Sequence, residues 1–215
     1  MSRARPELIR ELAADLRPLG ATAGRVGRSL GLWILLSAAF VIGVILATGP
    51  LRPGVGSQLL HAPQLLLEVL AGAAVVCAGA LAALRLGVPH PTAAVRRVTP
   101  FALAAGLWLA LLLLALIHPA AEPSMLGKRE HCNYQTFLLG LPPTLLGLWL
   151  LRPFAAFQRW IAGAVLGAAA GAIPAITMQL ACMYVPAHAL VAHVAPVLGL
   201  VLVGAALGPL VLRRI

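Results

Sequence analysis

The sequence predicts an all-α integral membrane protein, folded as a bundle of six transmembrane helices with the N- and C-termini in the cytoplasm. Two observations support this fold class: long apolar segments that carry almost no charge, and basic residues that collect in alternate gaps between them. Of the 215 residues, 61% are hydrophobic and 10% are charged. About 20 apolar residues cross the hydrocarbon core of a bilayer as a helix. The six expected spans are 30–48, 65–84, 101–117, 136–151, 160–181 and 189–212.

The distribution of Lys and Arg predicts the orientation of these spans. All but three of the 16 Lys and Arg residues lie in the N-terminal tail, in the second and fourth gaps, or at the C-terminus. The exceptions are Arg52, Lys128 and Arg129. Because cytoplasmic segments carry the excess of positive charge, both termini are expected inside. This topology accounts for most of the net charge of +10, and no basic groove interleaved with aromatic residues is visible, so direct nucleic acid binding is not expected.

The chain divides into a cytoplasmic tail, residues 1–29, and a six-helix transmembrane domain, residues 30–215. In the tail, Leu8, Leu12 and Leu16 recur every four residues beside Ile9, which predicts a short amphipathic helix. A helix of about eleven residues is marginal in water, so we expect it to fold on a surface. That surface is either the lipid headgroups or the groove of a partner protein.

Glycines mark the last two spans. Gly163, Gly167 and Gly171 repeat every four positions in the fifth span, and Gly204 and Gly208 do so in the sixth. This spacing places the glycines on one helix face, where a second backbone can approach closely. We interpret them as helix-packing surfaces rather than a pore lining.

Two cysteines lie next to the ends of spans. Cys132 precedes the fourth span and Cys182 follows the fifth, so the predicted topology puts both at the periplasmic interface. Two thiols at one depth in an oxidising compartment can form a disulfide or bind a soft metal ion together. His131, His188 and His193 are nearby candidate ligands. The residues alone leave the disulfide, the metal site and two unrelated thiols open.

Few other residues could carry chemistry. Cys77 lies in the middle of a span and is expected to pack as a small hydrophobe. Glu68, near the outer end of the second span, is a functional candidate, or else it reaches the interface or pairs with Arg52. No serine–histidine–acid set, phosphate-binding loop or metalloprotease helix is present, so an enzyme is not expected. Apart from a transient soft metal ion at Cys132 and Cys182, no cofactor is expected.

The alternative function from composition alone is a small six-helix transporter or channel. Such a protein needs polar or charged residues deep in several helices. Here Glu68, Thr177 and Gln179 are nearly all that the spans offer, which disfavours transport.

A family resemblance begins in the tail, where residues 8–18 read LIRELAADLRP. This segment resembles the opening of NrsF-like proteins ("negative regulator of sigma F"), the six-helix inner-membrane anti-sigma factors of proteobacteria. The resemblance continues in scattered positions along the chain, at Cys132, Cys182, His193, Gly204 and Gly208. It departs at the C-terminus, where a proline stands in place of a more basic helix end.

The resemblance implies a mechanism. The tail would hold an extracytoplasmic-function (ECF) sigma factor at the bacterial inner membrane and keep it from core RNA polymerase. An oxidative or heavy-metal stress in the periplasm would act on the two cysteines and release the sigma factor. The implied partners are therefore an ECF-type sigma factor and the membrane. The tail residues expected to contact the sigma factor are Leu8, Ile9, Leu12, Leu16 and Arg17.

Overall fold

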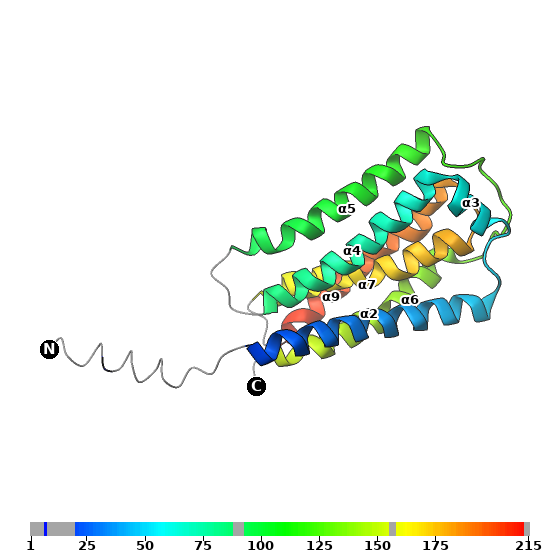
Figure 1. Ribbon diagram of the computed structural model, residues 1–215. Helices are drawn as coiled ribbons and strands as arrows, with labels where there is room; N and C mark the ends of the chain where they lie inside the picture. Colours follow the sequence, from blue (N-terminus) through cyan, green and yellow to red (C-terminus); the bar gives the residue numbers. More distant parts are fainter. Residues whose placement is uncertain (1–6, 8–19, 88–92, 155–157, 213–215) are drawn as a thin grey trace.

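The computed structural model of the protein describes residues 7, 20–87, 93–154 and 158–212. The regular secondary structure of the described part is helical, and loops such as 118–131 join the helices; one isolated bridge pairs Ser124 with Tyr184. Figure 1 shows the long helices lying side by side as a bundle. These are α2 (Gly20–Thr48), α4 (Pro63–Gly87), α5 (Ala94–Ile117), α6 (Cys132–Leu151), α7 (Arg159–Ala181) and α9 (Ala195–Val211). The shorter elements are α3 (Val55–His61), the 3-10 turn η1 (Arg152–Phe154), α8 (Pro186–His188) and the π-helical turn η2 (Ala189–Val194).

Six helical segments are long and apolar enough to cross a membrane, which confirms the predicted number of spans. Each contains most of one predicted span and extends it by a few residues, because a helix continues past its apolar stretch into the interface. The largest extension is in α2, which begins at Gly20. The next largest is in α5, which begins at Ala94 and so includes Arg96, Arg97 and Pro100. In the sixth span, α8, η2 and α9 run on as one segment, Pro186–Val211.

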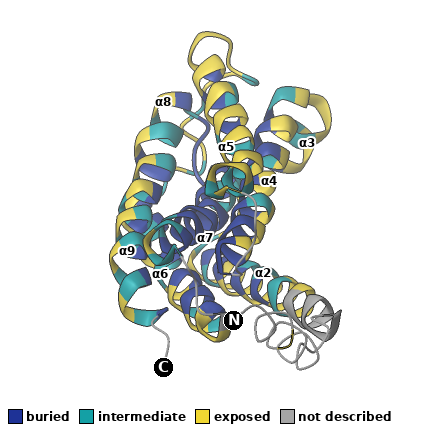
Figure 2. Ribbon diagram, turned by 90° about the vertical axis from the view of Figure 1, so that its left-hand side faces the viewer, coloured by how far each residue is buried: buried dark blue, intermediate teal, exposed yellow. Residues whose placement is uncertain are grey.

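Helix α7 forms the centre of the bundle. It is buried along most of its length, whereas most side chains of α5 and of residues 27–48 in α2 are exposed (Figure 2). The outward faces of the other helices are apolar; Leu35, Leu103 and Leu202 are each more than 60% exposed. An apolar outer surface around a small-residue centre is the arrangement expected of a bundle that lies in lipid.

The glycines of α7 and α9 face one another. A methyl group added at Gly163 would collide with the backbone carbonyl of Gly204, and one added at Gly208 would collide with the carbonyl of Arg159. At Gly167, the obstacle would be the carbonyl of Leu200. The two backbones therefore approach too closely for any side chain larger than hydrogen at these positions.

The bundle has two distinct ends. Helix α2 begins and α9 ends at the left-hand end of Figure 1, and α3 lies at the opposite end. The opposite end also holds the start of α6 and the end of α7, with Cys132 and Cys182, and is called the cysteine end below.

Cys77 departs from the sequence-based expectation. The prediction is that Cys77 packs as a small hydrophobe, but its side chain is exposed on the outer surface of α4. The reason is its position on the helix: the small residues Gly79 and Ala80 occupy the inward face of this turn.

Candidate functional site

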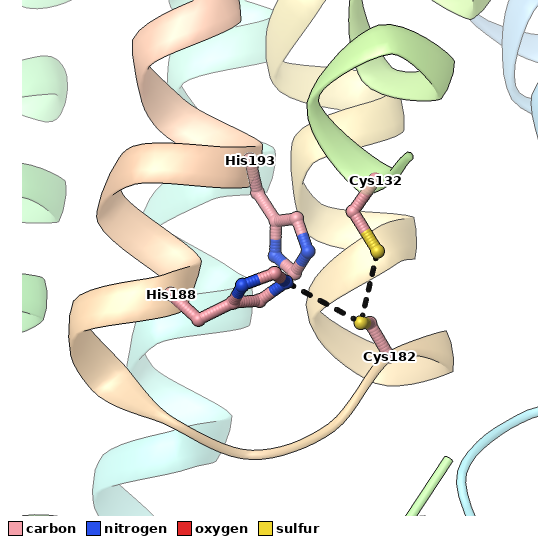
Figure 3. A group of neighbouring side chains, drawn as sticks. All are labelled: Cys132, Cys182, His188 and His193. Carbon is pink, nitrogen blue, oxygen red and sulfur yellow. Dashed lines mark hydrogen bonds between the residues drawn. The ribbon is translucent and has the colours of Figure 1, made fainter. Parts of the chain in front are cut away.

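Four potential ligand residues converge at the cysteine end from different elements. Cys132 is the first residue of α6, Cys182 directly follows α7, His188 ends α8 and His193 lies in η2. The Sγ atoms of Cys132 and Cys182 are 3.0 Å apart, and Cys182 Sγ is 3.5 Å from His188 Nε2. Figure 3 shows both imidazole rings directed toward the sulfur atoms. One ligand atom from each residue lies within 4.8 Å of the others.

The two thiols are unequal. Both are buried, and Cys132 Sγ also lies 3.3 Å from the carbonyl oxygen of Arg129. The hydrogen bond between the two sulfur atoms holds the pKa of Cys182 below its ordinary value. A lowered pKa favours the thiolate, which is the form of cysteine that acts as a nucleophile and as a metal ligand. At a separation of 3.0 Å, the sulfurs can close to a disulfide or share a metal ion with a small movement.

Arg52 holds the end of α7 in place beneath Cys182. Its Nη1 donates to the carbonyl oxygens of Gln179 (3.2 Å) and Cys182 (3.0 Å), and its Nη2 donates to Oε1 of Gln58 (2.7 Å). The guanidinium also lies 5.3 Å from the centre of the Tyr184 ring. Cationic groups stabilise the last carbonyls of a helix. Arg52 therefore positions the backbone that carries Cys182. The arginine itself is buried, with 2% of its surface exposed.

Arg129 binds the carbonyl oxygens at the end of α2 in the way that Arg52 binds those at the end of α7. Its guanidinium donates to the carbonyl oxygens of Ile45 (3.3 Å), Gly49 (2.7 Å) and Pro50 (2.8 Å). Since Arg129 lies three residues before Cys132, this contact fixes the start of α6 against the end of α2. Neither arginine was predicted from the sequence to bind the carbonyl oxygens at a helix end. The available signal was that both arginines stand on the side that is otherwise poor in positive charge.

Glu68 is buried at the cysteine end of α4. Its Oε2 accepts a hydrogen bond from Gln179 Nε2 at 2.5 Å, and its Oε1 accepts one from Gln64 Nε2 at 3.3 Å. It is 1% exposed, so it does not reach the interface, and within the described residues it forms no ion pair with Arg52. Because Gln179 also accepts from Arg52 through its backbone, Glu68 belongs to the contacts that hold the end of α7.

The remaining predicted site residues fall into two groups. His131 is exposed, has φ 60°, and lies outside the four-residue group despite being next to Cys132. The tail residues Leu8, Ile9, Leu12, Leu16 and Arg17 lie outside the described residues.

A family model matches nearly the whole chain. The model for NrsF, described as a negative regulator of sigma F, matches residues 12–213. The chain belongs to the NrsF family. The NrsF match includes both cysteines, both converging histidines and the glycine faces of α7 and α9, together with Leu12 and Leu16 of the tail. No curated protein and no solved structure matches the chain.

Proposed function

We propose that this NrsF-family protein is an anti-sigma factor of the bacterial inner membrane. Its tail, residues 1–29, sequesters an ECF-type sigma factor in the cytoplasm, and a periplasmic oxidative or heavy-metal stress acting on Cys132 and Cys182 releases it. The observation that carries this proposal is the match to a negative regulator of sigma F over residues 12–213.

Three further features support it. The basic residues are concentrated on the side of the termini, which favours a cytoplasmic tail. The cysteines lie at the other end of the bundle, 3.0 Å apart, where a change in their bonding would alter how α6 and α7 meet. The buried Thr136 and Thr144 each donate to a carbonyl oxygen of their own helix, so they do not supply the polar path that a transporter needs.

The central test is capture of the sigma factor by the full-length protein. The purified protein in nanodiscs is incubated with an ECF sigma factor from the same genome, and the dissociation constant is measured for wild type, Leu12→Ala and Leu16→Ala. Truncating a buried leucine costs about 2–5 kcal/mol, and about 1.4 kcal/mol is a tenfold change in affinity. Each variant is therefore expected to bind at least about tenfold more weakly.

Arg10→Ala is the matched control, because Arg10 lies on the opposite side of the predicted tail helix from Leu12, and it is expected to bind like wild type. Equal affinity of wild type and the leucine variants contradicts a tail-mediated interaction. Binding of the tail to anionic vesicles, without sigma-factor binding, supports a helix that lies on lipid headgroups instead.

A further inference from the structure

The group of two thiols and two imidazoles at the cysteine end is complete enough to hold a metal ion by itself. We propose that Cys132, Cys182, His188 and His193 form a four-ligand site for a divalent closed-shell cation that prefers tetrahedral coordination, Zn²⁺ or Cd²⁺. This inference rests on the proposed function, because it states what the proposed sensory site binds. It goes further in assigning the two histidines as ligands and in choosing a metal site over a disulfide.

The distances suit such an ion. Zn²⁺ binds sulfur at about 2.3 Å and imidazole nitrogen at about 2.0–2.1 Å, so ligand atoms around a tetrahedral ion lie about 3.3–3.8 Å from one another. The observed separations are 3.0 Å between the sulfurs and 3.5 Å between Cys182 Sγ and His188 Nε2. All four ligand atoms lie within 4.8 Å of one another. Movements of about 1 Å bring all four into coordination distance.

His193 is the strongest indication of a ligand. Its ring is 1% exposed, and neither Nδ1 nor Nε2 has a hydrogen-bond partner. A buried polar group without a partner costs about 1–3 kcal/mol. A metal ion coordinated by one ring nitrogen satisfies that nitrogen. A Cys132–Cys182 disulfide leaves both ring nitrogens of His193 as they are, so the disulfide alone does not account for this residue.

The π-helical turn explains how two histidines five residues apart reach one site. In an α-helix, each residue turns the chain by about 100°, so residues five apart point about 140° away from each other. The segment Ala189–Val194 is instead π-helical, and its hydrogen bonds join residues five apart. The rings of His188 and His193 consequently lie together, with centroids 5.1 Å apart and an interplanar angle of 88°. Single π-turns of this kind are frequent at functional sites.

Pro196 favours this wider turn. A proline lacks the N–H that would donate to the carbonyl four residues earlier, and its ring clashes with that carbonyl. The carbonyl concerned is that of Ala192, which lies within η2. The sequence therefore contains a local reason for the turn at the place where the two imidazoles must meet.

Charge favours a divalent ion over a monovalent one. Two thiolates and two neutral imidazoles carry two negative charges, which a divalent cation neutralises. Cys132, Cys182 and His193 are buried, and a net charge in such surroundings is costly. A neutral complex avoids that cost, and the sulfur ligands extend the site to the softer Cd²⁺.

The test uses the purified, reduced full-length protein in nanodiscs, titrated with Co²⁺ as a spectroscopic probe and then with Zn²⁺ and Cd²⁺ in competition. One equivalent of Co²⁺ is expected to give the visible absorption of tetrahedral coordination together with sulfur-to-metal charge transfer, and Zn²⁺ is expected to displace it. His188→Ala and His193→Ala are each expected to lower Zn²⁺ affinity at least about tenfold, since even partners outside the ligand set change affinity by about 10–100-fold.

His131→Ala is the matched control, because His131 is adjacent to Cys132 but outside the group, and it is expected to keep wild-type affinity. Loss of the cobalt spectrum in the cysteine variants with full retention in both histidine variants overturns the four-ligand site. So does the absence of a tetrahedral spectrum in wild type. His188 is only partly buried, so His188→Ala tests the proposal even if His193→Ala does not fold.

The outcomes for metal and for sigma factor are separable. Metal binding with the expected variant pattern, but no captured sigma factor, leaves the metal site standing and contradicts the proposed function. Capture of the sigma factor without metal binding supports the proposed function and contradicts the metal site.

Discussion

Arg52 and Arg129 are two of the three basic residues that interrupt the charge pattern of the chain, and each has a structural reason to do so. Arg52 donates to carbonyls at the end of α7, and Arg129 donates to carbonyls at the end of α2. A positive charge at a helix C-terminus is stabilised by the carbonyls it meets there. The cysteine end is thus organised by arginines that the general bias of membrane topology disfavours.

Replacing Arg52 should therefore destabilise the protein. Arg52→Met keeps much of the aliphatic stem but removes the donors to Gln179 and Cys182. One hydrogen bond from a charged donor contributes about 1.5–3 kcal/mol, so we expect a loss of at least about 1.5 kcal/mol in unfolding experiments in detergent. Lys128→Met, an exposed change at the same end, is the control and should be nearly neutral. Similar effects of the two variants would show that Arg52 does not support the end of α7.

The two cysteines should behave as one unit in the response to stress. Cys132→Ser and Cys182→Ser are each expected to abolish induction of a sigma-dependent reporter, and the double variant should be no worse than either single one. Such non-additivity is characteristic of residues in direct contact, as expected for sulfur atoms 3.0 Å apart. Cys77→Ser should respond like wild type, since Cys77 lies on the outer surface of α4. Substantial induction in both single variants would refute a paired sensor.

At the scale of the site, the sequence predicts both cysteines and both converging histidines as candidate ligands, together with His131. The sequence does not show that His131 lies outside the group, because a residue adjacent to Cys132 in the sequence need not direct its side chain toward the thiols. The left-handed backbone at His131 and the π-helical turn before Pro196 decide which imidazoles face the thiols. Neither feature has a hydrophobic periodicity that could reveal it.

Among the elements, the pair α7 and α9 depends on backbone contact. Gly204→Ala places a methyl group against the carbonyl of Gly163, so the helices must separate. Overpacking of this kind costs about 1–3 kcal/mol, which should appear as a lower stability in detergent. Gly106→Ala on α5 is the matched control, because nothing lies within 4 Å of the added methyl group. That variant should be neutral or more stable by about 0.5–1 kcal/mol, since glycine weakens a helix. If Gly106→Ala destabilised the protein as much as Gly204→Ala does, the loss of stability could not be attributed to the α7–α9 contact.

For the whole molecule, the described ends of the bundle set a simple topological test. The start of α2 and the end of α9 share one end, and the cysteine end is opposite. The native thiols are buried and would report slowly on accessibility, so a cysteine-free protein with Met125→Cys is preferable; Met125 is 57% exposed. An impermeant maleimide should label Met125→Cys in intact spheroplasts.

A second variant, Ser2→Cys, provides the control from the tail and should be labelled only after the membrane is opened. Labelling of both in intact spheroplasts, or of Ser2→Cys alone, would rule out the predicted orientation with the tail in the cytoplasm.

Composition and periodicity were sufficient to predict six membrane spans, because crossing a bilayer requires long apolar segments that any local window reveals. They were also sufficient to place Cys132 and Cys182 at the same end, since each adjoins a span and the connections alternate sides. Only the tertiary structure decided that α7 is the central helix and that Cys77 faces outward, because all six spans are apolar overall and their mean hydropathy does not show which face points inward. It also decided which histidines meet the thiols. That arrangement brings together residues as far apart in sequence as Cys132 and His193, and it depends on a π-helical turn whose geometry differs from that of an α-helix.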